Sequence, residues 1–148
     1  MRIVSPSHPG SADLGALVLR IALGVMYIAH SLVLKYFVFT LPGTAQFFAS
    51  LGLPPVLAYL VFWSELIGGI MLVLGIWPRL VALALAPVLV GALWTHAGNG
   101  WVFSAANGGW EYPLFLIVVS AVQGLIGDGA YALLPTPTPR GLQTTRTA

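Results

Sequence analysis

Six side chains that could do chemistry lie within or beside long apolar stretches of this sequence, where charged groups and imidazoles are rare. They are Arg20, His30, Glu65, His96, Glu111 and Tyr112. Glu65 is the clearest of them, because it interrupts the apolar run 56–74 near its middle. A carboxylate near the centre of a membrane span costs at least about 2.5–3.5 kcal/mol. Glu65 therefore needs a partner, a proton or a function.

Arg20 is the partner that the sequence suggests for Glu65. If both segments are helical, each presents a face of small and polar residues: Arg20, Gly24, Tyr27 and Ser31 on one, and Ala58, Phe62, Glu65 and Gly69 on the other. Gly24 and Gly69 would let the two backbones approach closely. We expect an Arg20–Glu65 salt bridge that fixes how the helices dock. The alternatives are a Glu65 that exchanges protons or binds a ligand, and a protonated, passive Glu65.

The two histidines are compatible with more than one chemistry. As proton carriers near neutral pH, His30 and His96 could serve a quinone. As axial ligands they could hold a b-type haem, but haem is not expected, because two histidines without a known spacing rule prove little. The structural alternative for each is a hydrogen-bonded histidine at the membrane interface. Glu111 and Tyr112 are equally well explained by a helix amino terminus and an interfacial position.

Composition sets the class of protein. Of 148 residues, 58% are hydrophobic and 7% are charged, whereas a soluble domain has about 25% charged residues. The chain is therefore predicted to be an integral membrane protein. It has no cysteine, which excludes disulfides, thiolate-bound metals and thiol relays within this chain. No metal site is predicted, and a formal charge of +2 is too small to indicate nucleic-acid binding.

Hydropathy divides the chain into four segments long enough to cross a bilayer. They are residues 14–39, 54–76, 78–96 and 110–126. Between the first two, Thr44 to Leu51 is expected to form a short helix with Thr44 as cap and Gly52 as stop. Pro87 is expected to kink the third segment. The predicted fold class is all-α: a polytopic, antiparallel four-transmembrane-helix bundle with a short interfacial helix between spans one and two.

Three regions and an orientation follow from this division. We expect a flexible cytoplasmic lead-in at 1–13 with Ser11 capping the first helix, a membrane domain at 14–131, and a disordered cytoplasmic tail at 132–148. Basic residues outside the spans gather on one side: Arg2, Arg79, Arg140 and Arg146. Positive residues collect in the cytoplasm, so both termini are expected there. No cleaved signal peptide is predicted.

In this orientation an ionisable set gathers in the outer half of the bundle. It comprises His30, Lys35, His96, Glu111 and Tyr112. Glu65 lies about midway, and Arg20 lies about 9 Å from the cytoplasmic end of its helix. Intramembrane ionisable groups face the bundle interior or a wet cavity. We therefore expect these side chains to converge on one interior space.

Short motifs in a fixed order resemble those of DoxX-family membrane proteins, from about Leu14 to Tyr131. They are Leu19-Arg20-Ile21-Ala22-Leu23-Gly24, His30-Ser31 with Lys35, Ala49-Ser50-Leu51-Gly52-Leu53-Pro54, Glu65-Leu66-Ile67-Gly68-Gly69, Leu74-Gly75-Ile76-Trp77-Pro78-Arg79, His96 with Asn99-Gly100, and Asn107-Gly108-Gly109-Trp110-Glu111-Tyr112-Pro113. The sequence departs from the family pattern at Ser31 and Lys35. The resemblance implies a four-helix inner-membrane protein. Some members are linked to thiosulfate:quinone oxidoreductase, or to an oxidoreductase complex with superoxide dismutase and a sulfurtransferase.

Two functional hypotheses from different classes remain. The first is a membrane subunit of a quinone-related or oxidative-stress redox system, with oxidoreductase partner proteins and chemistry supplied by a cofactor or partner. The second is a small proton-coupled transporter that acts as a homodimer. A non-catalytic scaffold is the third possibility. The redox hypothesis is preferred, because Arg20 on the facing helix would hold Glu65 ionised rather than free to titrate. The sequence assigns no catalytic residue.

Overall fold

The part of the protein that the structure describes consists of helices and the segments that connect them. The computed structural model describes residues 9–137, and residues 1–8 and 138–148 lie outside it. The elements in chain order are α1 (Ser11–Ile28), the π-helix η1 (Ala29–Val38), α2 (Leu41–Ser50), α3 (Val56–Leu74), α4 (Pro78–Ala84), α5 (Ala86–His96), the 3₁₀-helix η2 (Ala97–Asn99) and α6 (Glu111–Ile126). Only an isolated bridge, between Ile76 and Leu134, has β-type pairing among the described residues.

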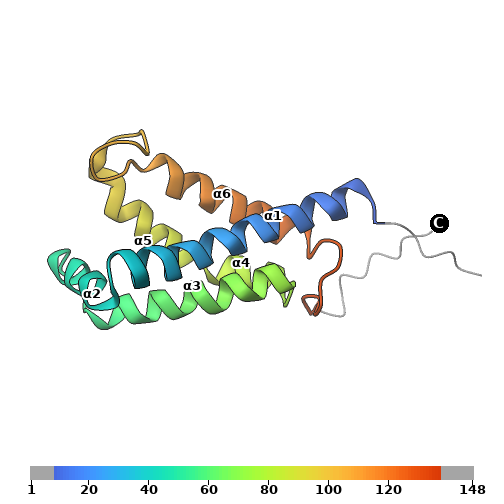
Figure 1. Cartoon of the computed structure of the whole chain (residues 1–148). Helices are drawn as coiled ribbons and strands as arrows, with labels where there is room; N and C mark the ends of the chain where they lie inside the picture. The colour runs from blue at the N-terminus through green and yellow to red at the C-terminus, as the bar shows by residue number, and fades with distance from the viewer. Residues whose placement is uncertain (1–8, 138–148) are drawn as a thin grey trace, which may run out of the picture.

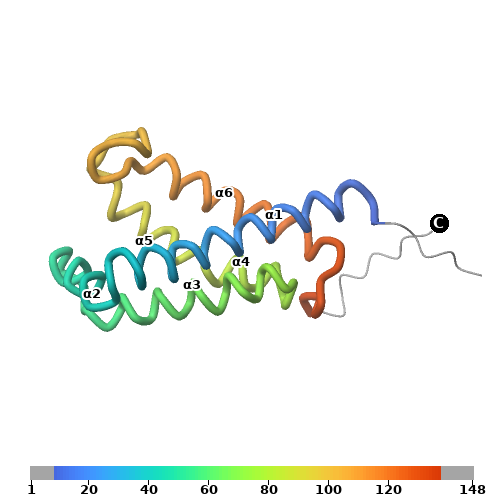
Figure 2. Tube along the Cα trace, viewed as in Figure 1, coloured from blue at the N-terminus to red at the C-terminus, as the bar shows by residue number. Residues whose placement is uncertain are grey.

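The helices form two layers, α1 with α3 and α6 with α4 and α5, and the layers meet at one end of the molecule (Figure 1). In Figure 1, α1 lies alongside α3 in the opposite direction, and α6 lies on the other side of α1. The helices α4 and α5 follow one another along α6. The start of α1, the turn between α3 and α4, and the end of α6 meet at one end, whereas α2 and the 97–110 connection lie at the other (Figure 2).

Three helical segments are long and apolar enough to cross a membrane, judged by length and composition. They are Ser11–Val38, Val56–Leu74 and Pro78–Asn99. The fourth apolar helix, α6, has 16 residues and is shorter than these. Large apolar side chains such as Phe37, Trp63 and Phe115 are exposed on the outside of the molecule, as expected where lipid replaces water. The prediction of a helical membrane protein is confirmed, while a count of four spans stays a prediction.

The contact between α1 and α3 depends on two glycines. A Cβ atom on Gly24 would lie 2.6 Å from the carbonyl oxygen of Gly69, and a Cβ on Gly69 would lie 2.8 Å from that of Gly24. No larger residue fits at either position without a shift of the backbone. The predicted close approach at Gly24 and Gly69 is confirmed. Beside it lies the apolar core, built around Leu23, Tyr27 and Leu72.

The third apolar segment is interrupted, as Pro87 predicts. The helix α4 ends at Ala84 and α5 begins at Ala86, with Pro87 in its first turn. A proline lacks the amide hydrogen that would continue the hydrogen-bond ladder, so it is tolerated only near a helix start. Leu85, at the break, is buried and packs against Gly68 of α3.

Two predicted helix caps are wrong by a few residues. Gly10 caps α1 and donates its amide to Asp13 at 3.2 Å, so Ser11 is the first helical residue and not the cap. Thr40, not Thr44, caps α2, and its hydroxyl accepts from the Gly43 amide at 3.2 Å. Pro42 causes the second error: it reads as a break, although proline is favoured in the first turn of a helix. The predicted stop at Gly52 is confirmed by its positive φ of 78°.

The segment after α6 is part of the fold, which corrects the predicted tail boundary. Leu133 donates to the Leu74 carbonyl at 3.3 Å, and Leu134 donates to Gly75 at 3.0 Å and accepts from Trp77 at 2.8 Å. These bonds cover the turn between α3 and α4, whose backbone groups need partners. The expectation of disorder is therefore wrong for residues 132–137. The rest of the predicted tail, 138–148, lies outside the described residues, as does most of the predicted lead-in.

Candidate functional site

Arg20 does not pair with Glu65, so this central prediction is wrong. The guanidinium of Arg20 is 1% exposed and donates to the carbonyls of Leu72 at 3.1 Å, Val73 at 3.1 Å and Ala130 at 2.7 Å. Leu72 and Val73 belong to the last turn of α3, whose carbonyls lack helical partners. Arg20 therefore closes the carboxyl end of α3 and holds the segment after α6 against it.

The antiparallel register of α1 and α3 explains why Arg20 cannot reach Glu65. Because Gly24 lies opposite Gly69, Arg20, four residues before Gly24, is level with Val73. Glu65, four residues before Gly69, is level with Ile28. The eight residues between these levels correspond to about 12 Å along the helices, which is more than an arginine side chain spans.

Lys35 is the partner of Glu65. The Nζ of Lys35 lies 2.7 Å from Oε2 of Glu65, and the two side chains are 15% and 6% exposed. Lys35 also approaches the carbonyl of His30 at 3.5 Å. The face of α3 that carries Glu65 is buried at Ala58, Phe62 and Gly69, as predicted. The carboxylate of Glu65, near the middle of α3, is therefore paired with a cation. An unpaired charge within a membrane span would be costly.

The π-helix η1 carries Lys35 into this position. Its backbone is wound more widely than an α-helix, and such segments frequently occur at functional sites. Ser31, inside η1, is 0% exposed and donates to the Ile28 carbonyl at 3.0 Å. Lys35 follows Ser31 by four residues, so the predicted face of span one could have been extended to it. That spacing is the signal by which the sequence could have identified Lys35.

His30 and Tyr112 lie next to the ion pair. Nδ1 of His30 is 2.9 Å from the Met26 carbonyl, and because a carbonyl can only accept, Nδ1 must carry the hydrogen. In the neutral ring, Nε2 is then the basic nitrogen that can accept a proton or a hydrogen bond. The ring stacks on Tyr112 with centroids 6.2 Å apart and planes inclined by 22°. The structure thus brings His30, Lys35, Glu65 and Tyr112 into one cluster, hereafter the ion-pair cluster.

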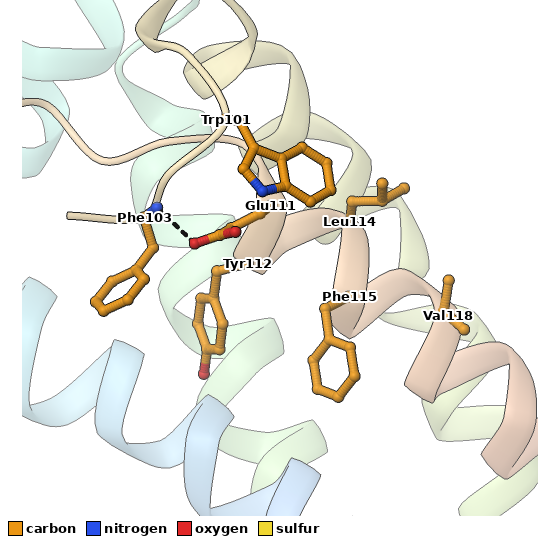
Figure 3. Close-up of a pocket in the computed structure, with 7 residues that line it drawn as sticks. All are labelled: Trp101, Phe103, Glu111, Tyr112, Leu114, Phe115 and Val118. Atoms are coloured by element: carbon orange, nitrogen blue, oxygen red, sulfur yellow. Dashed lines mark hydrogen bonds between the residues drawn. The ribbon is translucent and has the colours of Figure 1, made fainter. Parts of the chain in front are cut away.

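An apolar groove opens beside the ion-pair cluster. Its volume is about 470 Å³, and it is lined by Trp101, Phe103, Glu111, Tyr112, Leu114, Phe115 and Val118. In Figure 3, Tyr112 and Phe115 point from α6 toward the ribbon of α1, while Trp101 lies at the upper end of the groove. Aromatic faces therefore lead from the outside of the molecule to Tyr112, which contacts His30.

His96 and Glu111 hold the 97–110 connection and do not join the ion-pair cluster. Nδ1 of His96 lies 3.0 Å from the carbonyls of both Asn107 and Gly108. Glu111 accepts from the amide of Phe103 at 2.8 Å, as the dashed line in Figure 3 shows. Both residues belong to the same end of the molecule as the cluster. Their observed partners make them anchors of a loop, so the prediction that all the ionisable groups converge is wrong for these two.

No group of three or more His, Asp or Glu side chains is placed to hold a metal ion within residues 9–137. The cluster instead offers one cation, one carboxylate, one imidazole and one phenol, carried by η1, α3 and α6. Such a set can bind a polar headgroup by hydrogen bonds, stack an aromatic ring, and exchange protons at His30.

Comparison with known proteins agrees with the resemblance in the motifs. The DoxX family model matches residues 15–98. The chain is also 34% identical over 125 residues to a protein of Bacillus subtilis (strain 168) named "Putative oxidoreductase CatD", which covers 84% of this chain and 88% of that protein. No solved structure matches. The matched region contains Arg20, His30, Lys35, Glu65 and His96, and the chain belongs to the DoxX family.

Proposed function

We propose that this protein is the membrane-embedded subunit of a redox system and that the ion-pair cluster binds the headgroup of a quinone-like molecule. In this proposal the chain sits in the inner membrane with both termini in the cytoplasm, and four helices span the bilayer. The family and the oxidoreductase relative support a redox-related role at the membrane. The headgroup site is the more specific step, and it rests on the geometry of the cluster.

The observation that carries the proposal is an aromatic groove lined by Tyr112, whose ring stacks on His30 beside the buried Lys35–Glu65 ion pair. A quinone has a flat ring, two carbonyl acceptors and an apolar tail. The groove offers Phe115 and Tyr112 for the ring and tail. Behind them, the Lys35 ammonium and the neighbouring imidazole can donate to or exchange protons with carbonyl oxygens.

The residues of this chain would handle protons rather than electrons. Reduction of a quinone to a quinol takes two electrons and two protons. Electrons come in this proposal from an oxidoreductase partner protein, because this chain has no cysteine for a thiol relay. Once Nε2 of His30 has taken up a proton, His30 is the first proton donor to the bound ring, and Glu65 holds Lys35 in position.

The test is quinone-dependent stabilisation of the purified protein in mild detergent. We expect a short-chain ubiquinone or menaquinone analogue to raise the melting temperature, since a ligand that binds only the folded state stabilises it by mass action. An alcohol with the same alkyl tail but no ring is the control for nonspecific insertion. No shift with either quinone, or an equal shift with the alcohol, would overturn the proposal.

Two variants localise the effect. Tyr112→Ala removes the aromatic face that stacks on His30, and His30→Gln removes the basic nitrogen but keeps the size of the side chain. Both should abolish most of the quinone-dependent shift while leaving the melting temperature without quinone close to that of the wild type. Tyr59→Ala, on an exposed part of α3, is the matched control and should keep the full shift.

A further inference from the structure

The aromatic groove beside the ion-pair cluster runs along α6 from the start of the helix to its middle. Tyr112, at the cluster end, is the second residue of α6, and Val118 lies six residues further on. Six residues correspond to about 9 Å along the helix axis. In Figure 3, Leu114, Phe115 and Val118 follow one another along the ribbon of α6, away from Trp101. Because α6 is a spanning helix in the proposed function, the groove leads from the cluster into the hydrocarbon layer and not toward the membrane surface.

The part of the groove that is farther from the cluster is open on its outer side. Phe115 is 61% exposed and Val118 is 53% exposed, and both side chains are apolar. Side chains exposed at the middle of a spanning helix face acyl chains, because the bilayer core holds no water. A molecule dissolved in the bilayer can therefore reach the groove from the side.

The end of the groove that lies nearer the membrane surface is closed by the connection between α5 and α6. The Trp110 amide donates to the Gly100 carbonyl at 3.1 Å, and the Glu111 amide donates to the Trp101 carbonyl at 3.1 Å. The Glu111 carboxylate accepts from the Phe103 amide at 2.8 Å. The rings of Trp101 and Trp110 meet edge to face, with centroids 4.5 Å apart. Entry from the aqueous side would break these three hydrogen bonds, whereas entry from the bilayer breaks none of them.

We propose that the groove takes up a quinone with a long apolar tail directly from the bilayer, with the tail held along Phe115 and Val118. This inference rests on the proposed function and deepens it, because the substrate class becomes a quinone that resides in the membrane. The volume of about 470 Å³ lies within the range of small-molecule sites, about 300–1,000 Å³. The ring enters first and meets Tyr112, and the tail follows toward Val118, so the connection between α5 and α6 stays closed.

Photo-crosslinking of the wild-type protein in lipid nanodiscs tests the direction of the tail. The probe is a decyl-ubiquinone analogue that carries a diazirine at the end of its tail. We expect labelling of the part of α6 that contains Phe115 and Val118, and an excess of unmodified decyl-ubiquinone should reduce it at least tenfold. Decanol at the same mole fraction in the lipid is the control and should not compete. Labelling of the 97–110 connection instead, or equal competition by decanol, would refute the proposal.

Two tryptophan variants test the groove itself. Val118→Trp fills the groove and should weaken the binding of decyl-ubiquinone by about three- to tenfold, because the tail loses its packing contacts. Val90→Trp is the matched control, since Val90 of α5 is 54% exposed but does not line the groove. The concentration dependence of the melting temperature measures both affinities. Equal affinities for the two variants would contradict the proposed path of the tail.

A quinone without a tail separates this inference from the proposed function. The tailless ubiquinone ring should still raise the melting temperature of the wild type, but with a lower affinity than decyl-ubiquinone after correction for partition into the detergent. If it raises the melting temperature and binds as tightly as decyl-ubiquinone, or if the tail labels another surface, the ring site stands and the bilayer route is wrong. If neither quinone raises the melting temperature, the proposed function fails and this inference fails with it.

Discussion

Arg20 and Lys35 lie on the same continuous helical segment, yet the two ends of the bundle use them in opposite ways. Arg20 is surrounded by carbonyls and contacts no carboxylate among the hydrogen bonds of the described chain. It ties together α1, the end of α3 and the segment after α6. Lys35 meets a carboxylate, with an imidazole, a phenol and an aromatic groove nearby. One end is therefore built as a closed structural joint, and the other holds the cluster that we propose as the quinone site.

The two ends also differ in how their connections are held. At the Arg20 end, Arg79 donates to the carbonyls of Gly124 at 2.8 Å and Leu125 at 3.2 Å, and Asp128 binds Thr136. At the Lys35 end, α5 packs mainly along α6, and the 97–110 connection is held by His96 and Glu111. Loops held by a few side chains on a rigid scaffold commonly carry function. Removing contacts at the Arg20 end should therefore lower the stability of the protein. Removing contacts at the Lys35 end should weaken the binding of the proposed ligand.

The largest effect is expected from Arg20→Met. It leaves the carbonyls of Leu72, Val73 and Ala130 without their buried donor, which should destabilise the protein by about 3–5 kcal/mol. Thermal melting in detergent measures the loss. Protein that remains folded should still respond to quinone, because the ion-pair cluster is untouched. A variant of wild-type stability would show that Arg20 is not the joint described here.

The Lys35–Glu65 pair should show strong non-additivity. Lys35→Met alone leaves a buried carboxylate and should cost about 2–4 kcal/mol, while Lys35→Met combined with Glu65→Leu should cost less. The same cycle with Arg20→Met and Glu65→Leu is the matched control, and its losses should add. Coupling of Glu65 to Arg20 rather than to Lys35 would contradict the observed pairing. Free energies of unfolding for the wild type and the five variants provide the measurement.

Gly24→Ala tests the close contact between α1 and α3, which lies between the two ends of the bundle. The new Cβ would meet the Gly69 carbonyl at 2.6 Å, so α1 and α3 must move apart, at a cost of about 1–3 kcal/mol. Because Gly24 sets the register for both ends, quinone-dependent stabilisation should weaken as well. Gly15→Ala is the control, since its Cβ would meet nothing within 4 Å. Equal melting temperatures for the two variants would refute the close-contact argument.

The smallest effect is expected from Asp128→Ala. Asp128 accepts from the Thr136 amide at 2.8 Å and from its hydroxyl at 2.6 Å, and this partly exposed contact should contribute about 1 kcal/mol. The loss should appear as faster hydrogen exchange of residues 133–136, with quinone binding unchanged. Unaltered exchange there would mean that the segment is held by the backbone bonds to Leu74 and Gly75 alone.

Much of the fold follows from one-dimensional patterns. The apolar runs predict the helices, and the positions of Gly24 and Gly69 predict where two of them touch. The predicted caps are wrong because neighbouring candidates, Gly10 and Ser11 or Thr40 and Thr44, are of similar quality in the sequence, and only the observed turn selects one. The pairing after α6 was missed because residues 132–137 carry no periodic signal. Their backbone partners come from the distant α3–α4 turn.

The sequence alone determined that this chain is a helical membrane protein, which residues share a buried face, and that Glu65 needs a compensating group, because hydropathy and helical periodicity are local properties. Only the tertiary structure decided which cation compensates it. That choice depends on the register between α1 and α3, set by the Gly24–Gly69 contact. It also depends on the winding of η1 that brings Lys35 to Glu65. A shift of one helix by about two turns would bring Arg20 level with Glu65 without changing a single residue.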